Sequence, residues 1–215
     1  MTTPDRTRSI RRIVPVAVLA LVGSLAVTGY LGYAHLTSQR ADQAPAAEGT
    51  IVADYGPLVD FTLTTQHGTP LSRDDLRGNI WLADFIFTYC AGPCPLMTAR
   101  MAELQKALAD IDALRLVSFS VDPDRDTPEV LKEYGDRYGA DHDRWTFLTG
   151  DIVTIMHVAI EGFAIGDRED PILHSTLFAL VDQRGHIRGY YHSDEPELID
   201  KIRHDLDILR REDPA

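Results

Sequence analysis

A run of 22 residues from Ile13 to Ala34 contains no charged side chain, and it divides the chain into parts with different surroundings. A helix of that length measures about 33 Å, which is enough to cross the apolar core of a bilayer. Because arginines precede the run, the N-terminus is expected in the cytoplasm and the rest of the chain on the other side. We therefore predict a single-pass protein of the cell membrane, with a cytoplasmic segment over residues 1–12, an anchor over residues 13–36 and a folded part on the periplasmic side.

A cleaved signal peptide is the alternative interpretation of this run. The apolar part of a signal peptide has about 7–15 residues, and the run in this chain is longer. The nearest site with small residues, at Ala44, is followed by Pro45, which disfavours cleavage there. An uncleaved anchor that binds the membrane is the interpretation that both observations favour.

The rest of the chain is acidic. From Thr37 onward it carries 17 basic and 32 acidic side chains, a net charge of −15. Phosphate binding requires a basic surface, so this charge argues against nucleic acid as a partner. Residues 37–54 are polar and rich in alanine, which predicts a linker, and residues 55–211 contain no second linker, which predicts one folded domain.

Strand and helix patterns alternate within that domain. The continuous apolar run Ile80 to Phe87 is typical of a strand that is covered on both faces. Other strands are expected at 61–64, 114–121, 177–181 and 187–191, and helices at 94–108, 126–138 and 195–210. This order predicts an α/β fold, a thioredoxin-like sandwich of the peroxiredoxin-related kind.

The two cysteines of the chain, Cys90 and Cys94, lie where the apolar strand ends and a helix begins. Ligands commonly bind at the carboxyl end of a strand, and a helix N-terminus favours the thiolate, which is both a nucleophile and a metal ligand. Cysteines four residues apart can form a disulfide or hold one metal ion. A purely stabilising disulfide would close a very short loop and remove little chain entropy, and structural zinc would need further ligands.

Four segments of this sequence resemble the Sco/SenC family of copper-delivery proteins. They are FIFTYCAGPCP (85–95), SVDPDRDTPEVLKEY (120–134), WTFLTGD (145–151) and HSTLFALVDQRG (174–185). The resemblance covers most of the domain in the family's order and spacing. It implies a thioredoxin-like fold and copper ligands at Cys90, Cys94 and His174. Thiolates suit Cu(I), and the added imidazole suits both Cu(I) and Cu(II).

The function that the resemblance implies is a copper metallochaperone, which delivers copper to the dinuclear copper A centre of cytochrome oxidase. The expected partner is the copper A subunit or another copper-receiving protein. This is transfer of a metal ion rather than turnover of a small substrate. A thiol–disulfide oxidoreductase that reduces cysteines of the receiving protein is the alternative, and a sensor of copper or redox state is a third possibility.

The cysteine segment favours the reductase, whereas the residue before Thr176 opposes it. The segment CAGPC resembles the thioredoxin CGPC motif with one inserted residue, and Asp84 occupies the offset of the buried thioredoxin carboxylate that assists proton transfer. An alternative role for Asp84 is that of a hydrogen-bonded strand residue. Thioredoxins place a cis-proline before the residue equivalent to Thr176, whereas this chain has Ser175 there, preceded by His174.

Further residues are weaker candidates. Asp84 and Asp122 could tune the ligands without binding the metal, and Asp126 is expected to cap the following helix. Met97 and Met101 have helical spacing, which favours core packing over metal binding. No partner is predicted for three other histidines: His157, His186 and His192.

Overall fold

The computed structural model describes residues 52–166 and 175–212. Within these two ranges, no helix has the length and apolar character needed to cross a membrane. The predicted anchor and most of the predicted linker lie outside the described residues, as does His174.

The apolar run around Leu82 forms β3 (Ile80–Ile86), an inner strand of a seven-stranded sheet in the order β2-β1-β5-β4-β3-β6-β7. The strands are β1 (Thr62–Thr65), β2 (Pro70–Ser72), β3, β4 (Leu114–Ser120), β5 (Trp145–Thr149), β6 (Leu177–Val181) and β7 (Ile187–His192). Strands β3, β4 and β5 are parallel, whereas β6 runs antiparallel to β3 and β1 runs antiparallel to β5. The carboxyl ends of β3, β4 and β5 therefore meet at one edge of the sheet.

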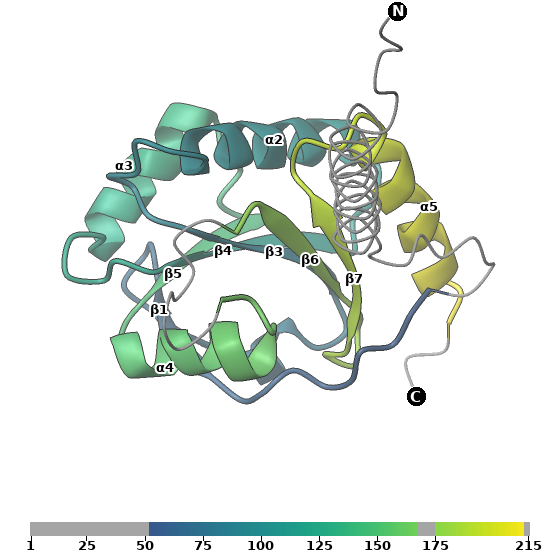
Figure 1. Ribbon diagram of the computed structural model, residues 1–215, viewed down its shortest axis with the longest axis horizontal. Helices are drawn as coiled ribbons and strands as arrows, with labels where there is room; N and C mark the ends of the chain where they lie inside the picture. Colours follow the sequence, from purple (N-terminus) through teal and green to yellow (C-terminus); the bar gives the residue numbers. More distant parts are fainter. Residues whose placement is uncertain (1–51, 167–174, 213–215) are drawn as a thin grey trace, which may run out of the picture. The chain divides into compact units, whose positions relative to one another are not determined.

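Helices cover both faces of the sheet (Figure 1). The α-helices are α2 (Cys94–Ala107), α3 (Pro128–Tyr138), α4 (Ile152–His157) and α5 (Leu198–Leu209). Leu82 and Ile86 belong to the core that includes α2, α3 and α5, whereas Trp81 and Phe85 belong to the core that includes α4. Because side chains alternate along a strand, Asp84 faces α2 together with Leu82 and Ile86.

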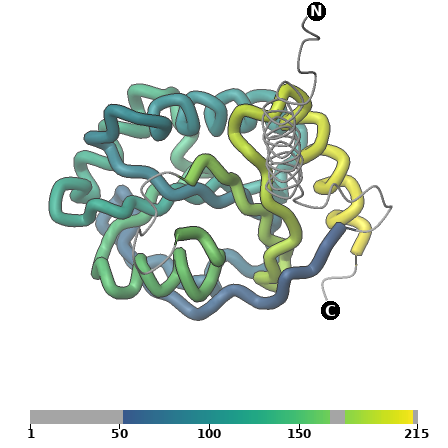
Figure 2. The backbone as a smooth tube through the Cα atoms, in the orientation of Figure 1, coloured from purple at the N-terminus to yellow at the C-terminus, as the bar shows by residue number. Residues whose placement is uncertain are grey.

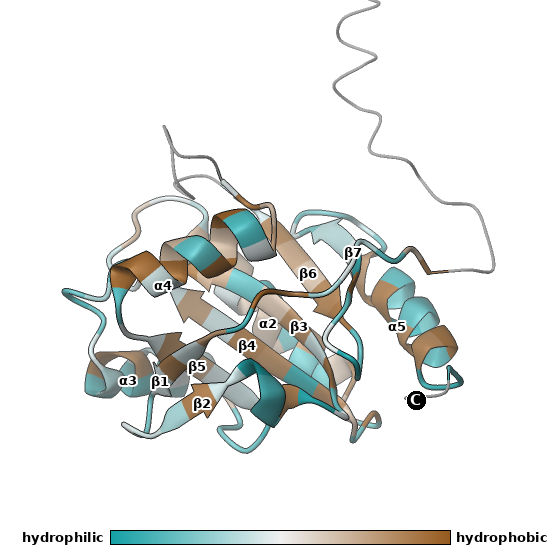
Figure 3. Ribbon diagram, turned by 90° about the horizontal axis from the view of Figure 1, so that it is seen from below, coloured by the Kyte–Doolittle hydropathy of each residue, from teal (hydrophilic) through white to brown (hydrophobic). Residues whose placement is uncertain are grey.

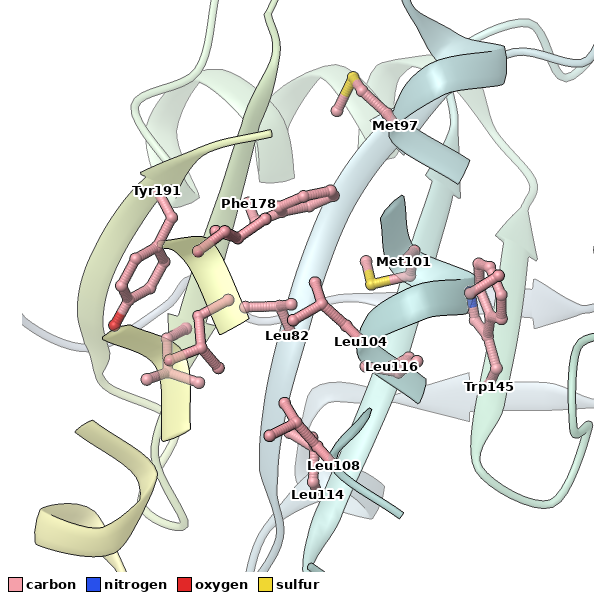
Figure 4. Packing of buried hydrophobic residues seen from close by; sticks show 14 of the residues in the cluster. Leu82, Met97, Met101, Leu104, Leu108, Leu114, Leu116, Trp145, Phe178 and Tyr191 are labelled. Atoms are coloured by element: carbon pink, nitrogen blue, oxygen red, sulfur yellow. The ribbon is translucent and has the colours of Figure 1, made fainter. Parts of the chain in front are cut away.

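The helices have the amphipathic character that this arrangement requires. In Figure 3, apolar and polar segments alternate along α4 and α5. In Figure 4, Met97 and Met101 extend from α2 into the core that also contains Leu82 and Leu104. Both methionines are almost completely buried, which confirms that they pack in the core.

The structure corrects the predicted start of α3. We expected Asp126 to cap this helix, but the N-cap is Thr127, whose hydroxyl accepts a hydrogen bond from the Val130 amide. Pro128 follows at the start of the helix, and Gly139, with φ of 71°, ends it in the left-handed region. The Asp126 side chain is therefore free for another role.

Two parts of the fold were not predicted. The strand β5 contains only five residues, and α4 is followed by a π-helical turn over Val158–Gly162. Their patterns are too short to separate from loop sequence by periodicity alone. Residues 52–58 run beside the β6–β7 hairpin (Figure 2), where the amide of Tyr55 donates to the carbonyl of Ile187 at 2.9 Å.

Candidate metal centre

The two cysteines lie at the carboxyl edge of the parallel strands, as the sequence predicted. A short loop connects β3 to α2, and Cys94 is the first residue of that helix. Cys90 is partly exposed, whereas Cys94 is 5% exposed, and both thiols are free. The strand fixes one end of the loop and the helix fixes the other, so the two sulfur atoms belong to one small site.

The environment of Cys90 favours its thiolate. Burial raises the pKa of Cys90, but hydrogen bonds from the Cys94 thiol and from the backbone amides of Cys94 and Gly92 outweigh that effect, so the pKa falls below its ordinary value. The Gly92 amide lies 3.3 Å from the Cys90 sulfur. Amides at a helix N-terminus stabilise negative charge in this way. Cys90 is therefore a partly exposed thiol whose thiolate is favoured, which is the form that acts as a nucleophile and as a metal ligand.

Cys94 has the opposite character. The pKa of Cys94 rises to about 12, chiefly because the thiol is buried. Its hydrogen bond to Cys90 and the nearby charges of Cys90 and Asp84 raise the pKa further, whereas a backbone hydrogen bond at Phe87 lowers it. Cys94 therefore keeps its proton at neutral pH. A metal ion or a base must remove that proton before the second sulfur can bind or react.

Asp84 is fully buried, and within the described residues neither of its carboxylate oxygens has a hydrogen-bond partner. Burial raises the pKa of Asp84 to about 7. The hydroxyl of Ser118, its neighbour on β4, opposes this rise only in part, since it does not reach hydrogen-bond geometry. Within the described residues, no hydrogen bond supports the alternative role of Asp84 as a hydrogen-bonded strand residue. The charge of Asp84 contributes to the raised pKa of Cys94, so the two groups influence each other.

Asp122 and Asp126 lie in the loop that follows β4, at the same edge. The Asp122 carboxylate is partly exposed and pairs with Arg125 at 3.1 Å. The Arg125 guanidinium lies 5.6 Å from the ring centre of Tyr89, and the Tyr89 side chain is 79% exposed beside Cys90. Asp126 is completely buried and bonds to Thr88, two residues before Cys90.

The roles of Thr88, Tyr89 and Arg125 were not predicted from the sequence. The contact between Asp126 and Thr88 joins residues 38 positions apart, and no local pattern marks it. An acidic residue before Thr127 and Pro128 is typical of a helix cap, so the motif indicated the wrong role for Asp126.

The third predicted ligand, His174, lies outside the described residues. In the two ranges that the structure covers, no group of three His, Cys, Asp or Glu side chains is placed to hold a metal. The register of β6 supports the expected location: Ala179 pairs with Ala83 in antiparallel fashion, so the chain enters β6 at the edge where β3 ends. Ser175, the first described residue of this segment, therefore leads into β6 from the edge that carries Cys90.

Two of the remaining histidines are placed clearly. The Nδ1 atom of His186 lies 3.0 Å from an Asp54 oxygen, so this histidine has a partner that the sequence did not predict. His157 is exposed on α4, which covers the opposite face of the sheet from α2 (Figure 1). Neither residue belongs to the edge with the cysteines.

Comparisons with known proteins agree with the fold. The sequence model of the SCO1/SenC family matches residues 56–207. The SCO1 protein homolog of Bacillus subtilis is 39% identical over 156 residues, which are 68% of this chain and 79% of the homolog.

Two solved structures show the same mixed α/β fold. BsSco, a Sco family protein of cytochrome c oxidase assembly with a disulfide switch, is 36% identical, with a TM-score of 0.67 over 76% of this chain and 100% of BsSco. Bradyrhizobium japonicum ScoI, solved with copper bound, is 26% identical, with a TM-score of 0.57 over 72% of this chain and 99% of ScoI. With its fold, its paired thiols at the carboxyl edge and the match over residues 56–207, this chain belongs to the SCO1/SenC family.

Proposed function

We propose that this protein is a copper metallochaperone that binds copper through Cys90, Cys94 and His174 and delivers it to the copper A centre of a cytochrome oxidase. The observation that carries the proposal is the pair of free thiols, one accessible and one buried, at the N-terminus of α2. The copper-bound ScoI structure and the oxidase-assembly role of BsSco support the choice of metal and partner.

The two thiols suit a metal that must be both bound and released. The Cys90 thiolate is accessible, so it makes the first bond to incoming Cu(I). Cys94 binds second, and its proton leaves as its sulfur coordinates the ion, because only the thiolate is a strong ligand. The imidazole of His174 adds a nitrogen donor that Cu(II) prefers. Three protein ligands leave one side open for a receiving protein.

A thiol–disulfide reductase is the second candidate, and the asymmetry of the thiols favours it. The Cys90 thiolate would attack a disulfide of the receiving protein and displace one of its sulfurs as a thiolate. Cys94 would then lose its proton to a base, for which the buried Asp84 is the candidate, and attack the mixed disulfide. The second partner thiolate leaves, and two electrons pass to the partner as the Cys90–Cys94 disulfide forms.

Membrane attachment is part of the same proposal. The apolar run of residues 13–36 anchors the protein, residues 37–54 link the anchor to the domain, and the domain faces the periplasm. A reporter fused after Arg211 should be active outside the cytoplasm, and the mature protein should retain residues before Ile13. A released form that starts near Ala44 would contradict the anchor.

A transfer experiment separates the two functions. The reduced domain, first exposed to Cu(I), is mixed with the copper-free soluble domain of a copper A subunit, in one sample with reduced acceptor cysteines and in another with an acceptor disulfide. A metallochaperone forms the copper A absorption bands with the reduced acceptor. A reductase that carries no copper generates acceptor thiols from the oxidised acceptor but forms no copper A centre. Failure of copper transfer to a reduced, competent acceptor would overturn delivery as the function.

A further inference from the structure

The Asp126 carboxylate is completely buried. The hydrogen bonds described for it come from neutral groups, and none comes from a cationic side chain. Its Oδ2 accepts from the amide of Thr88 at 3.1 Å and from the hydroxyl of Ser120 at 2.5 Å. Its Oδ1 accepts from the hydroxyl of Thr88 at 2.5 Å. Removing a buried carboxylate from water is costly, so these three bonds must hold it firmly. The bonds fix Thr88 to the loop that follows β4.

A second contact connects the same two loops. Arg125, the residue before Asp126, lies over the ring of Tyr89, the residue after Thr88. Two consecutive residues of the β4–α3 loop therefore hold the two residues that precede Cys90. The Ser120 hydroxyl, which donates to Asp126, also accepts from the Asp122 amide at 3.1 Å, which orders the beginning of that loop.

The reactivity of Cys90 depends on the backbone that Thr88 begins. The Cys90 amide donates to the carbonyl of Phe87 at 3.3 Å, so the chain turns tightly across Thr88 and Tyr89. This turn sets where the Cys90 sulfur lies relative to the Gly92 amide, which donates to it at 3.3 Å. If Thr88 moves, the sulfur loses the donors that stabilise its thiolate.

We propose that Asp126 is a positioning residue, which holds Thr88 so that the Cys90 sulfur meets its amide donors and faces Cys94. This inference rests on the proposed function, since both copper transfer and disulfide exchange require that geometry. Groups that orient a ligand without touching the metal commonly contribute about 10- to 100-fold to affinity or activity. Asp126 has this relation to Cys90 and acts through Thr88.

The test compares two variants with a matched control. Asp126→Ala removes all three hydrogen bonds, and Thr88→Val removes only the hydroxyl contact while it keeps the side-chain volume. Thr127→Ala is the control, because it removes the cap of α3 from the same loop without a contact to Thr88. The readout is the rate at which iodoacetamide modifies Cys90 and Cys94 in the folded, reduced, copper-free protein, followed by peptide mass spectrometry.

We expect Asp126→Ala to lower the Cys90 alkylation rate about 10-fold at pH 7 and Thr88→Val to lower it less, while Cys94 remains slow. The Cu(II)–thiolate absorption band should also shift or weaken in both variants. Thr127→Ala should keep the rate of the unmodified protein. If Asp126→Ala does not fold, Thr88→Val alone decides the question.

An unchanged Cys90 rate in the folded Asp126→Ala variant, or in Thr88→Val where that variant alone folds, would overturn the proposal. An equal loss in Thr127→Ala would also overturn it, since general loosening of the loop would then explain the effect. The alkylation test uses no copper, so it is independent of delivery. If the unmodified protein failed to transfer copper while the variants still lost Cys90 reactivity, the proposed function would fail and the positioning role would stand.

Discussion

Two buried carboxylates, Asp84 and Asp126, lie near the cysteines and are held in different ways. Asp126 accepts three hydrogen bonds from Thr88 and Ser120, whereas neither oxygen of Asp84 has a partner among the described residues. Hydrogen bonds to the charged form favour a carboxylate, and burial without them favours the neutral acid. Asp126 therefore holds the loop that contains Thr88, whereas Asp84 is a carboxyl group whose raised pKa suits proton exchange.

The burial of Asp84 gives a prediction about pH. Its folded-state pKa of about 7 lies above the ordinary value of 3.8, so between these pH values the folded protein keeps a proton that the unfolded chain has lost. The free energy of unfolding should therefore fall as pH rises from about 4 to 7. Asp84→Asn should remove this fall and stabilise the protein at pH 8 by up to ~4 kcal/mol.

Urea denaturation at pH 5 and pH 8 measures the effect, with the exposed Asp124→Asn as the control. Parallel pH dependence in the unmodified protein and in Asp84→Asn would contradict the account. In the same variant, reduction of the Cys90–Cys94 disulfide should slow while Cu(I) binding remains nearly intact. Unchanged exchange kinetics would assign Asp84 a purely structural role.

The sequence allowed Cys90, Cys94 and Asp84 to be identified because each follows from a local pattern. A strand end followed by a helix start placed the cysteines, and a single acid within an apolar run indicated a buried carboxylate. The role of Asp126 depends on Thr88 in another loop, and the partner of His186 is Asp54, 132 positions away. Such contacts exist only once the sheet brings the segments together.

At the scale of elements, Arg188 joins three distant segments. This nearly buried side chain pairs with Asp182 at 2.9 Å and with Glu212 at 2.6 Å, and it donates to the carbonyls of Val52 and Ala53. It therefore holds the residues where the described chain begins and ends against the β6–β7 hairpin. Residues 52–54, which the sequence assigned to the linker, are bound to the domain here.

Arg188→Leu should lower the free energy of unfolding by about 3–5 kcal/mol, because it removes the buried cation that pairs with the buried Asp182. Arg184→Leu is the matched control, since Arg184 contacts the same Asp182 from a more exposed position and should cost less than about 1 kcal/mol. Urea denaturation followed by circular dichroism gives both values. Equal losses of unfolding free energy in the two variants would show that the burial of an arginine does not determine how much it stabilises the protein.

Most of the helices and strands were predictable, including the short strands β1 and β6, whereas β5 and α4 were not. Strand β3 and helices α2, α3 and α5 carry enough periodic residues to define their type, and their observed bounds lie within about three residues of the predicted ones. Strand β6 is as short as β5, but it was predicted because it forms a local hairpin with β7, whereas β5 and the six-residue α4 have no such neighbour in the sequence. The place of β5 in the fold is set by its pairing with β4 and β1. The place of α4 is set by its packing against the core that includes Trp81 and Phe85.

At the scale of the described domain, the cysteines and residues 52–58 lie at opposite edges of the sheet. The amide of Gly78, just before β3, donates to the carbonyl of Gln183 in the β6–β7 turn, where residues 52–58 are bound. Cys90 follows the other end of β3, a strand that spans about 20 Å. Residues 52–58 are therefore bound at the end of the sheet that is remote from Cys90.

The central claim is that Cys90, Cys94 and His174 hold copper together. Cu(II) binding, followed by visible absorption, tests it most directly in the unmodified domain, in His174→Ala and in the exposed control His157→Ala. Cu(II) prefers a nitrogen donor beside the thiolates, so His174→Ala should lose stoichiometric Cu(II) binding while His157→Ala retains it. Disulfide exchange, which requires only the two sulfurs, should persist in His174→Ala, and cells that carry this variant should lack oxidase activity. Normal Cu(II) binding with normal oxidase activity in His174→Ala would contradict the account and leave the reductase as the better explanation.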